Sequence, residues 1–334
     1  MSTAPLALTM GEPGGVGPEI TCAAWSALRN GQVSFFVLAD PALFRSERVD
    51  VKIIRSPAEA SASFGAALPV LPLKCSVNST IGVAEPQNAS AVIESIEKAV
   101  SLTLAGKASG VVTNPIQKSS LIQHGFKFPG HTEFLAELTK NAKMPADRAR
   151  GPVMMIAGPT LRTVPVTIHQ SVKAAVSLLS ADLIIKICTV AAQSLKHDFG
   201  VQSPRLAVSG LNPHAGEAGA IGTEDAEIIT PALKALRESG IEARGPLPAD
   251  TMFHEEARAR YDAAICMLHD QALIPAKTLA FHEAVNVTLG LPIIRTSPDH
   301  GTALDIAGKG VARADSLIAA IRLAAQIAER RGAI

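Results

Sequence analysis

Short apolar runs alternate with longer segments of helical periodicity along most of the chain. The alternation predicts an α/β fold with a largely parallel sheet covered by helices. The runs that read as buried strands are 6–10, 33–38, 110–113, 152–156, 164–168, 205–209, 263–268, 285–289 and 293–296. The segments that read as helices are 18–27, 87–104, 181–195, 224–239 and 314–330.

Three of the predicted strands run into a histidine, at His169, His214 and His269. Open α/β sheets carry their chemistry just past the carboxyl ends of the strands, so the three imidazoles could converge on one divalent metal ion. Three protein ligands leave a coordination position open, as in catalytic sites. A single histidine at a strand end is more often a hydrogen-bonded residue without such a role, and it is the repetition that favours a metal.

Two sets of residues are candidates for binding an anion. Lys277, Asn286 and Arg295 lie in or beside predicted strands, where an unpaired charge is costly, and arginine can grip a phosphate or carboxylate with two hydrogen bonds. His131 and Thr132, after the strand at 110–113, could also donate to a substrate anion. Alternatively, Thr132 simply caps a helix that begins at Glu133.

Two polar, glycine-bearing loops are candidates for binding a cofactor. Glycines at 11–17 let a ligand approach the backbone, and the helix that follows offers free N–H groups. This loop is not the dinucleotide fingerprint, because Ile20 stands where the third glycine belongs. A tight strand–helix turn is the alternative. The loop at 297–310, with His300 and Asp305, suits a nucleoside, or else begins a capped helix near Thr302.

Composition narrows the class of protein. A chain of 334 residues is long enough for two domains or one large α/β unit, and 31 Lys and Arg nearly balance 30 Asp and Glu. No net charge recruits nucleic acid or an anionic membrane, and we expect neither partner. No secretion signal and no run of about 18 apolar residues is present. The four cysteines form no CxxC pair and indicate reduced thiols in a cytoplasmic protein.

At both ends the chain resembles a known superfamily. The 11–20 turn is similar to the Gly-Asp-Gly-Ile-Gly-Pro-Glu turn of isocitrate and isopropylmalate dehydrogenases, and 300–310 resembles their adenosine-binding loop. Those enzymes hold Mg²⁺ or Mn²⁺ with aspartates. The three histidines, the His131-Thr132 pair and the series Lys277, Asn286 and Arg295 instead resemble the 4-hydroxythreonine-4-phosphate dehydrogenase family, nearly end to end.

The resemblance implies an isocitrate/isopropylmalate dehydrogenase-like α/β fold of two α/β/α domains with an active-site cleft between them. Residues 1–130 and 295–334 would form the cofactor domain, and 131–294 the metal and dimer domain. It also implies a homodimer whose active site draws on both subunits. The implied sites are a Zn²⁺, Co²⁺ or Mg²⁺ site (His169, His214, His269), a substrate site (His131, Thr132, Lys277, Asn286, Arg295) and an NAD or NADP site (Gly14, Gly15, Gly17, His300, Gly301, Asp305).

The implied reaction is oxidation of 4-phosphooxy-L-threonine, a phosphorylated hydroxy-amino acid, in vitamin B6 biosynthesis. Lys277 is our candidate for the general base, with Asp250 and Asp270 as weaker candidates, either as bases or as partners of the metal-binding imidazoles. Alternatives stay open. Sister branches oxidise 4-phosphoerythronate, 4-phosphothreonate or a cyclic dihydrodiol, a metal-dependent hydrolase would also use three histidines, and a structural metal would need no catalysis.

Overall fold

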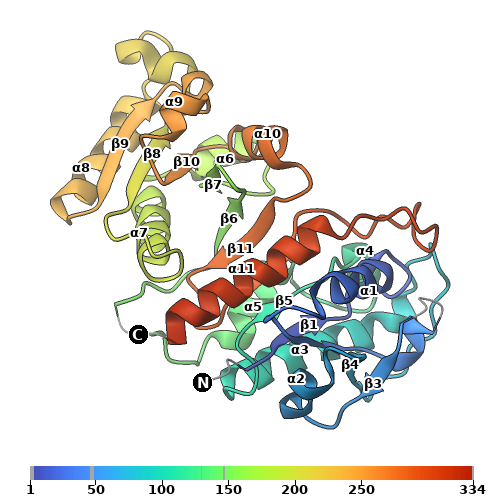
Figure 1. Cartoon of the computed structure of the whole chain (residues 1–334). Helices are drawn as coiled ribbons and strands as arrows, with labels where there is room; N and C mark the ends of the chain where they lie inside the picture. The colour runs from blue at the N-terminus through green and yellow to red at the C-terminus, as the bar shows by residue number, and fades with distance from the viewer. Residues whose placement is uncertain (1–3, 46–48, 129, 146, 333–334) are drawn as a thin grey trace. The chain divides into compact units, whose positions relative to one another are not determined.

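The computed structural model describes residues 4–45, 49–128, 130–145 and 147–332. The chain forms two compact units (Figure 1), unit 1 from residues 1–143 and 291–334, and unit 2 from residues 144–290. The sequence-based boundaries were 131 and 295, whereas the units change at 144 and 291, so the segment 131–143 falls in unit 1. Both units combine a sheet with covering helices, which confirms the predicted α/β class.

Unit 1 is built on a parallel sheet with the strand order β3-β4-β2-β1-β5-β12. Its inner strands are short and apolar because they are covered on both faces. Leu6, Ala7 and Leu8 of β1, for example, are at most 1% exposed. The strands are β1 (Leu6–Thr9), β2 (Phe35–Leu38), β3 (Val51–Ile53), β4 (Leu68–Leu71), β5 (Val111–Val112) and β12 (Arg295–Pro298).

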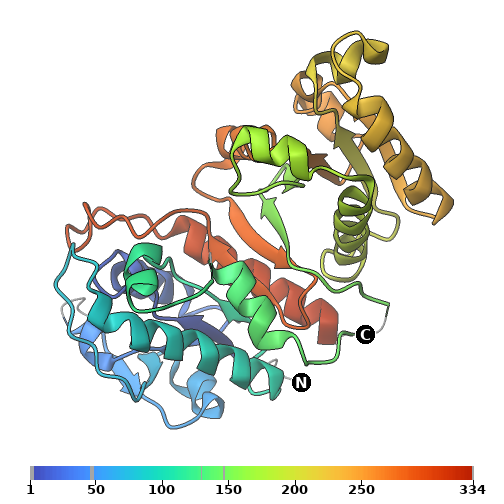
Figure 2. The same ribbon diagram turned by 180° about the vertical axis from the view of Figure 1, so that it is seen from behind.

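Helices cover both faces of the unit 1 sheet. Helices α1 and α11 pack against each other on one face, and α3 packs on β1, β2 and β5 on the other, beside α5 (Figures 1 and 2). Strand β12 and helix α11 come from the C-terminal part of the chain, and α11 packs on β12, β5 and β1. The helices are α1 (Gly17–Leu28), α2 (Ala60–Ser63), α3 (Ala89–Leu104), α4 (Lys118–Gln123), α5 (His131–Thr139) and α11 (Asp315–Gly332).

Unit 2 is built on a mixed sheet with the strand order β11-β6-β7-β10-β8-β9. Strand β10 lies between β7 and β8 and is parallel to both, and β9 continues the parallel part beyond β8. Strand β6 is antiparallel to β7 and to β11. The strands are β6 (Val153–Ala157), β7 (Arg162–Pro165), β8 (Arg205–Ser209), β9 (Glu242–Leu247), β10 (Ala263–Cys266) and β11 (Val285–Leu289).

Helix α10 packs on β6, β7 and β10 in unit 2, and α7 packs on β6, β8 and β11. Ala272, Leu273 and Ala276 of α10 join Ala264 and Cys266 of β10 in one buried apolar cluster. No single helix among the described residues is long and apolar enough to cross a membrane; α6 and α7 satisfy that test only together, across a 90° bend. The helices are α6 (Val172–Leu178), α7 (Ala181–His197), α8 (Thr230–Glu238), α9 (Glu255–Arg258) and α10 (His269–Ala280).

Several elements differ from the sequence-based expectation. Helix α10, unpredicted, begins at His269, so the polar residues after β10 form the first turn of a helix and not a loop. Helix α5 begins at His131 with Gly130 as its N-cap, so Thr132 is not the capping residue. The expected strand at 164–168 is β7, which ends at Pro165, so three residues separate it from His169. No helix begins near Thr302.

Candidate active site

The parallel strands β7, β10 and β8 of unit 2 end at the same edge of the sheet, and each is followed by one of the three histidines. Side chains tie these strand ends together. Thr167 Oγ1 donates a 2.7 Å hydrogen bond to the carbonyl of Met267. The Gln271 amide donates to the carbonyl of Gly210 at 3.1 Å and accepts from the Leu268 N–H at 3.0 Å. The segments that lead to the histidines are therefore cross-linked.

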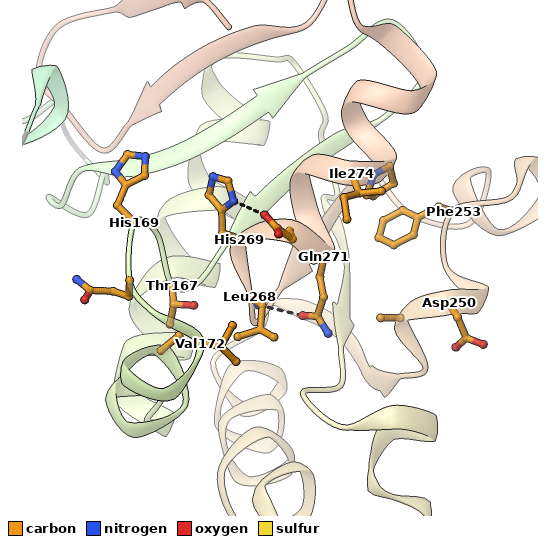
Figure 3. Close-up of a pocket in the computed structure, with 14 residues that line it drawn as sticks. Thr167, His169, Val172, Asp250, Phe253, Leu268, His269, Gln271 and Ile274 are labelled. Carbon is orange, nitrogen blue, oxygen red and sulfur yellow. Dashed lines mark hydrogen bonds and ion pairs between the residues drawn. The ribbon is translucent and has the colours of Figure 1, made fainter. Parts of the chain in front are cut away.

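His169 and His269 lie close together. Their ring centroids are 5.9 Å apart with the ring planes at 44°, and Figure 3 shows the rings side by side at the rim of a cavity. A 2.7 Å hydrogen bond joins Nδ1 of His269 to the Asp270 carboxylate, so Nε2 is the nitrogen that could bind a metal. Two imidazoles at this separation suit two ligand positions of a tetrahedral ion.

His214 lies in an exposed turn after β8. Among the described residues of one chain, no three His, Cys, Asp or Glu side chains lie close enough together to hold a metal ion. The structure thus brings together two of the predicted ligands, and the third remains a prediction. This pair of imidazoles is suited to hold a divalent cation.

A cavity of about 500 Å³ opens beside the two histidines in unit 2 (Figure 3). Its wall is mostly apolar, with Val172, Phe253 and Ile274 among the lining residues, and both Asp250 and Asp270 also line it. The cavity has space for a small organic substrate. The two aspartates that we expected near the metal therefore border the same cavity as the histidine pair.

Two further predicted residues belong to unit 2. Lys277 lies on α10, eight residues after His269, and Asn286 lies in β11. Both side chains are half-buried. Helix α10 thus carries a predicted metal ligand in its first turn and the candidate base two turns later, on a rigid element rather than on a loop.

In unit 1, Arg295, His131 and Lys118 form a group of basic side chains. Arg295 is 4% exposed, and burial lowers its pKa to about 10, so it remains charged at neutral pH. Burial, together with the charges of Arg295 and Lys118, holds the pKa of His131 well below its ordinary value. Nε2 of His131 is buried with no hydrogen-bond partner among the described residues. A neutral imidazole and a charged guanidinium in this environment are suited to hold an anion.

The two predicted cofactor loops lie together in unit 1, although they come from opposite ends of the chain. The N–H of Val16 donates to the carbonyl of Thr302 at 3.0 Å, and Glu19 accepts from the N–H groups of Gly308 and Ala312 at 3.2 Å each. A Cβ on Gly15 would lie 2.7 Å from the Thr302 carbonyl oxygen. Gly17 opens α1, and His300, Gly301 and Asp305 are exposed on the second loop.

Sequence reasoning missed several residues near these sites. Glu12 is 3% exposed, and burial raises its pKa to about 7, against the lowering effect of the Gly14 N–H. Thr113 accepts from Arg295, and Gln271 links two strand ends. Thr113 and Gln271 directly adjoin predicted site segments, which was a usable signal. Asp225, which binds the segment before His214, lies 11 residues beyond that histidine, and its sequence context gave no signal.

Comparisons with known proteins identify the family of this chain. The family model for the pyridoxal phosphate biosynthetic protein PdxA matches residues 32–324. A 4-hydroxythreonine-4-phosphate dehydrogenase from Caulobacter vibrioides is 54% identical, over 99% of this chain and 100% of that protein. Among solved structures, a 4-hydroxythreonine-4-phosphate dehydrogenase from Klebsiella pneumoniae has 36% identity and a TM-score of 0.85, with 98% of each chain covered.

A more distant solved structure is a terephthalate 1,2-cis-dihydrodiol dehydrogenase from Burkholderia xenovorans. It has 26% identity and a TM-score of 0.64, and the match covers 97% of this chain and 98% of that one. The PdxA model covers most of this chain, and the PdxA-type relatives are the more similar ones. The chain therefore belongs to the PdxA family of pyridoxal phosphate biosynthetic proteins.

Proposed function

We propose that this protein oxidises the C3 hydroxyl of 4-phosphooxy-L-threonine with NAD⁺ or NADP⁺ in vitamin B6 biosynthesis. The dinucleotide, when bound, would supply the hydride acceptor for C3, and the hydroxyl proton would leave to a base, which would give 2-amino-3-oxo-4-phosphooxybutanoate. Loss of CO₂ from this β-keto acid yields 3-amino-2-oxopropyl phosphate. Family membership supports the reaction type, and the observation that carries the proposal is the His169–His269 pair beside a substrate-sized cavity.

Different residues of the chain would bind the substrate, the metal and the dinucleotide. The predicted substrate-binding residues are His131, Thr132, Lys277, Asn286 and Arg295. His169 and His269 would hold a Zn²⁺, Co²⁺ or Mg²⁺ ion, with Asp270 orienting the His269 ring. A divalent cation, when bound, supplies a Lewis acid that lowers the pKa of a coordinated hydroxyl. The glycine loop (Gly14, Gly15, Gly17) and the facing loop (His300, Gly301, Asp305) would hold the dinucleotide.

Lys277 would take the hydroxyl proton, and Asp250, which lines the cavity, is the second candidate. A positioned base contributes about 10²–10⁴-fold to the rate. Lys277→Ala should therefore lower kcat by about that factor. The rate is measured at saturating substrate, as formation of the reduced nicotinamide. Asp250→Asn is the matched comparison. An unchanged kcat in Lys277→Ala would show that Lys277 is not the general base.

A homodimer would complete the metal site. One chain brings together His169 and His269 but no group of three ligands among its described residues. We therefore assign the third imidazole to His214 of the partner subunit. A two-fold dimer makes this exchange reciprocal, so each of two identical sites would receive one histidine from the other copy.

Mixed dimers test this arrangement. His169→Ala and His214→Ala should each be inactive alone. In the heterodimer of the two variants, one site lacks both His169 and His214, and the other site keeps all three histidines. Unfolding and refolding an equal mixture pairs the chains at random, so about half of the dimers should be heterodimers with one intact site of two. The mixture should therefore regain about a quarter of wild-type activity. A mixture of His169→Ala with His269→Ala is the control and should stay inactive. No recovery in the first mixture would mean that one chain supplies all three ligands.

A second class of substrate is the alternative to 4-phosphooxy-L-threonine. The resemblance to a terephthalate dihydrodiol dehydrogenase structure keeps a non-phosphorylated dihydrodiol as the second candidate. The buried Arg295 and neutral His131 favour the phosphorylated substrate. Initial rates with 4-phosphooxy-L-threonine, unphosphorylated 4-hydroxy-L-threonine and the dihydrodiol decide between them. Metal-dependent turnover of the phosphorylated compound alone is the expected outcome, and preference for the dihydrodiol would overturn the assignment.

A further inference from the structure

The carboxylate of Asp225 binds the segment that leads from β8 to His214. Asp225 is 2% exposed. Its Oδ1 accepts a 2.8 Å hydrogen bond from the N–H of Leu211, and its Oδ2 accepts from the N–H and the side-chain amide of Asn212, at 3.2 and 2.9 Å. Three donors from two consecutive residues thus converge on one buried carboxylate, and such charge-assisted bonds are stronger than neutral ones.

The loop is shaped around this carboxylate. A Cβ on Gly210 would lie 2.7 Å from Oδ1 of Asp225, and one on Gly216 would lie 3.2 Å from Oδ2. The Asn212 amide also donates to Glu224 at 2.8 Å. Glycines therefore stand where a side chain would displace the carboxylate, on both sides of His214.

The turn that Asp225 holds is costly in itself. Residues 214–218 all have a positive φ, between 43° and 78°, and only Gly216 among them is a glycine. A left-handed conformation costs about 1–2 kcal/mol for each non-glycine residue. Four such residues, two on each side of Gly216, need bonds from outside the turn to keep them there.

We infer that Asp225 is a positioning residue for His214. Its carboxylate keeps the left-handed turn that presents the imidazole as a metal ligand, and it acts through the backbone of residues 211 and 212 without touching metal, substrate or cofactor. The inference rests on the proposed function, because the position of His214 matters for binding only if this imidazole is a ligand.

Asp262 offers a matched control at the opposite end of the same strand. Its Oδ2 accepts from the N–H of Arg205 at 2.8 Å and from the Arg205 Nε at 3.1 Å. Asp262 thus accepts hydrogen bonds from the backbone and the side chain of one residue, Arg205, as Asp225 does from Asn212. Asp262 directly precedes β10 and binds Arg205 at the start of β8, whereas the His214 turn follows the end of β8.

The test compares metal affinity in Asp225→Asn and Asp262→Asn. Full-length protein stripped with a chelator is titrated with Co²⁺, followed by visible absorption, and thermal unfolding is recorded without metal. Asp225→Asn should weaken the Co²⁺ Kd by about 10- to 100-fold, the usual effect of losing a partner that orients a ligand. Asp262→Asn should lower Tm but leave the Co²⁺ Kd within about twofold, because it does not contact the turn.

Three outcomes would overturn the inference. A folded Asp225→Asn that binds Co²⁺ as tightly as wild type, or an equal loss of affinity in both variants, contradicts it while the proposed function stands. Wild-type protein that binds no Co²⁺ would contradict both the inference about Asp225 and the proposed metal site. If Asp225→Asn does not fold, Asn212→Ala replaces it: this variant keeps the two backbone bonds and loses the amide donor, so the Co²⁺ Kd should rise by only about three- to tenfold.

Discussion

The hydroxyl of Thr113 accepts two hydrogen bonds from the guanidinium of Arg295, one from Nε at 3.2 Å and one from Nη2 at 2.8 Å. Thr113 is fully buried and Arg295 nearly so. Because the guanidinium is planar, two bonds to one acceptor fix the orientation of the whole group. The cation that we propose to bind the substrate anion is thus oriented by a neighbouring strand before the substrate arrives.

Removing the Thr113 hydroxyl should weaken substrate binding more than turnover. Thr113→Val keeps the shape of the side chain but loses the acceptor, so we expect KM for 4-phosphooxy-L-threonine to rise about three- to tenfold with kcat within about threefold. Steady-state kinetics measure both. Thr139→Val, at an equally buried threonine of α5, should leave KM unchanged. An unchanged KM in Thr113→Val would contradict the orienting role.

The buried Glu12 should make stability depend on pH. Its folded pKa, about 7, lies above the ordinary 4.5 because burial disfavours the charged form. The contribution of Glu12 to the free energy of unfolding is therefore fully present below pH 4.5. It is lost as the pH rises through 7, which lowers the free energy of unfolding by on the order of 2 kcal/mol. Glu12→Gln should lack this decline. Urea unfolding of both proteins from pH 5 to about 8.5 checks the difference, and Glu97→Gln, at an exposed position, should behave as wild type.

The first glycine loop should be sensitive to a single methyl group. A Cβ on Gly14 would overlap the carbonyl oxygen of Val83 and lie 2.8 Å from that of Thr80. Gly14→Ala should therefore lower the free energy of unfolding by about 1–3 kcal/mol and raise KM for the dinucleotide. Gly301→Ala, where no atom lies within 4 Å, should change stability by less than about 0.5 kcal/mol. Equal effects of the two substitutions would contradict the packing argument.

A charge beside the cavity should dissociate the proposed dimer. Val172 and Ile274, both lining the cavity of unit 2, are 70% and 64% exposed, and a second copy that brings His214 to this rim would cover them. Ile274→Asp should shift the protein toward monomer in sedimentation velocity and lower activity at dilute protein concentration. Ile53→Asp, at a 57% exposed position of β3, should keep the dimer. A dimeric Ile274→Asp would place the interface elsewhere.

The sequence predicted most of the strands with a strong apolar pattern and missed β3, β4 and β9; β4 is buried and apolar but contains Pro69. Strands β3 and β9 lie at the edges of their sheets, where fewer side chains are buried, and β9 contains Gly245 and Pro246. Helix α10 was missed because Pro275 lies inside it and its first residues are polar. Edge strands and proline-containing helices depend on tertiary contacts that no local pattern records.

The candidate site divides in the same way. The sequence predicted that His169, His214 and His269 converge, because each follows a predicted strand, and the structure places His169 and His269 close together. The conformation of the turn that carries His214 could not be predicted, since its five consecutive left-handed residues and the bonds from the preceding segment to Asp225 follow no local pattern. The pairing of Thr113 with Arg295 joins residues 182 positions apart, so only the fold reveals it.

Unit 2 is inserted between α5 and β12 of unit 1, and this order has a consequence for synthesis. A ribosome completes residues 144–290 before it makes β12 and α11, the last strand and helix of unit 1. The apolar residues of β5 and β1 that pack against α11 therefore lack this cover while the inserted unit already has its whole sequence. The sequence of unit 2 is therefore complete before that of unit 1, whose core can close only after β12 and α11 have been made.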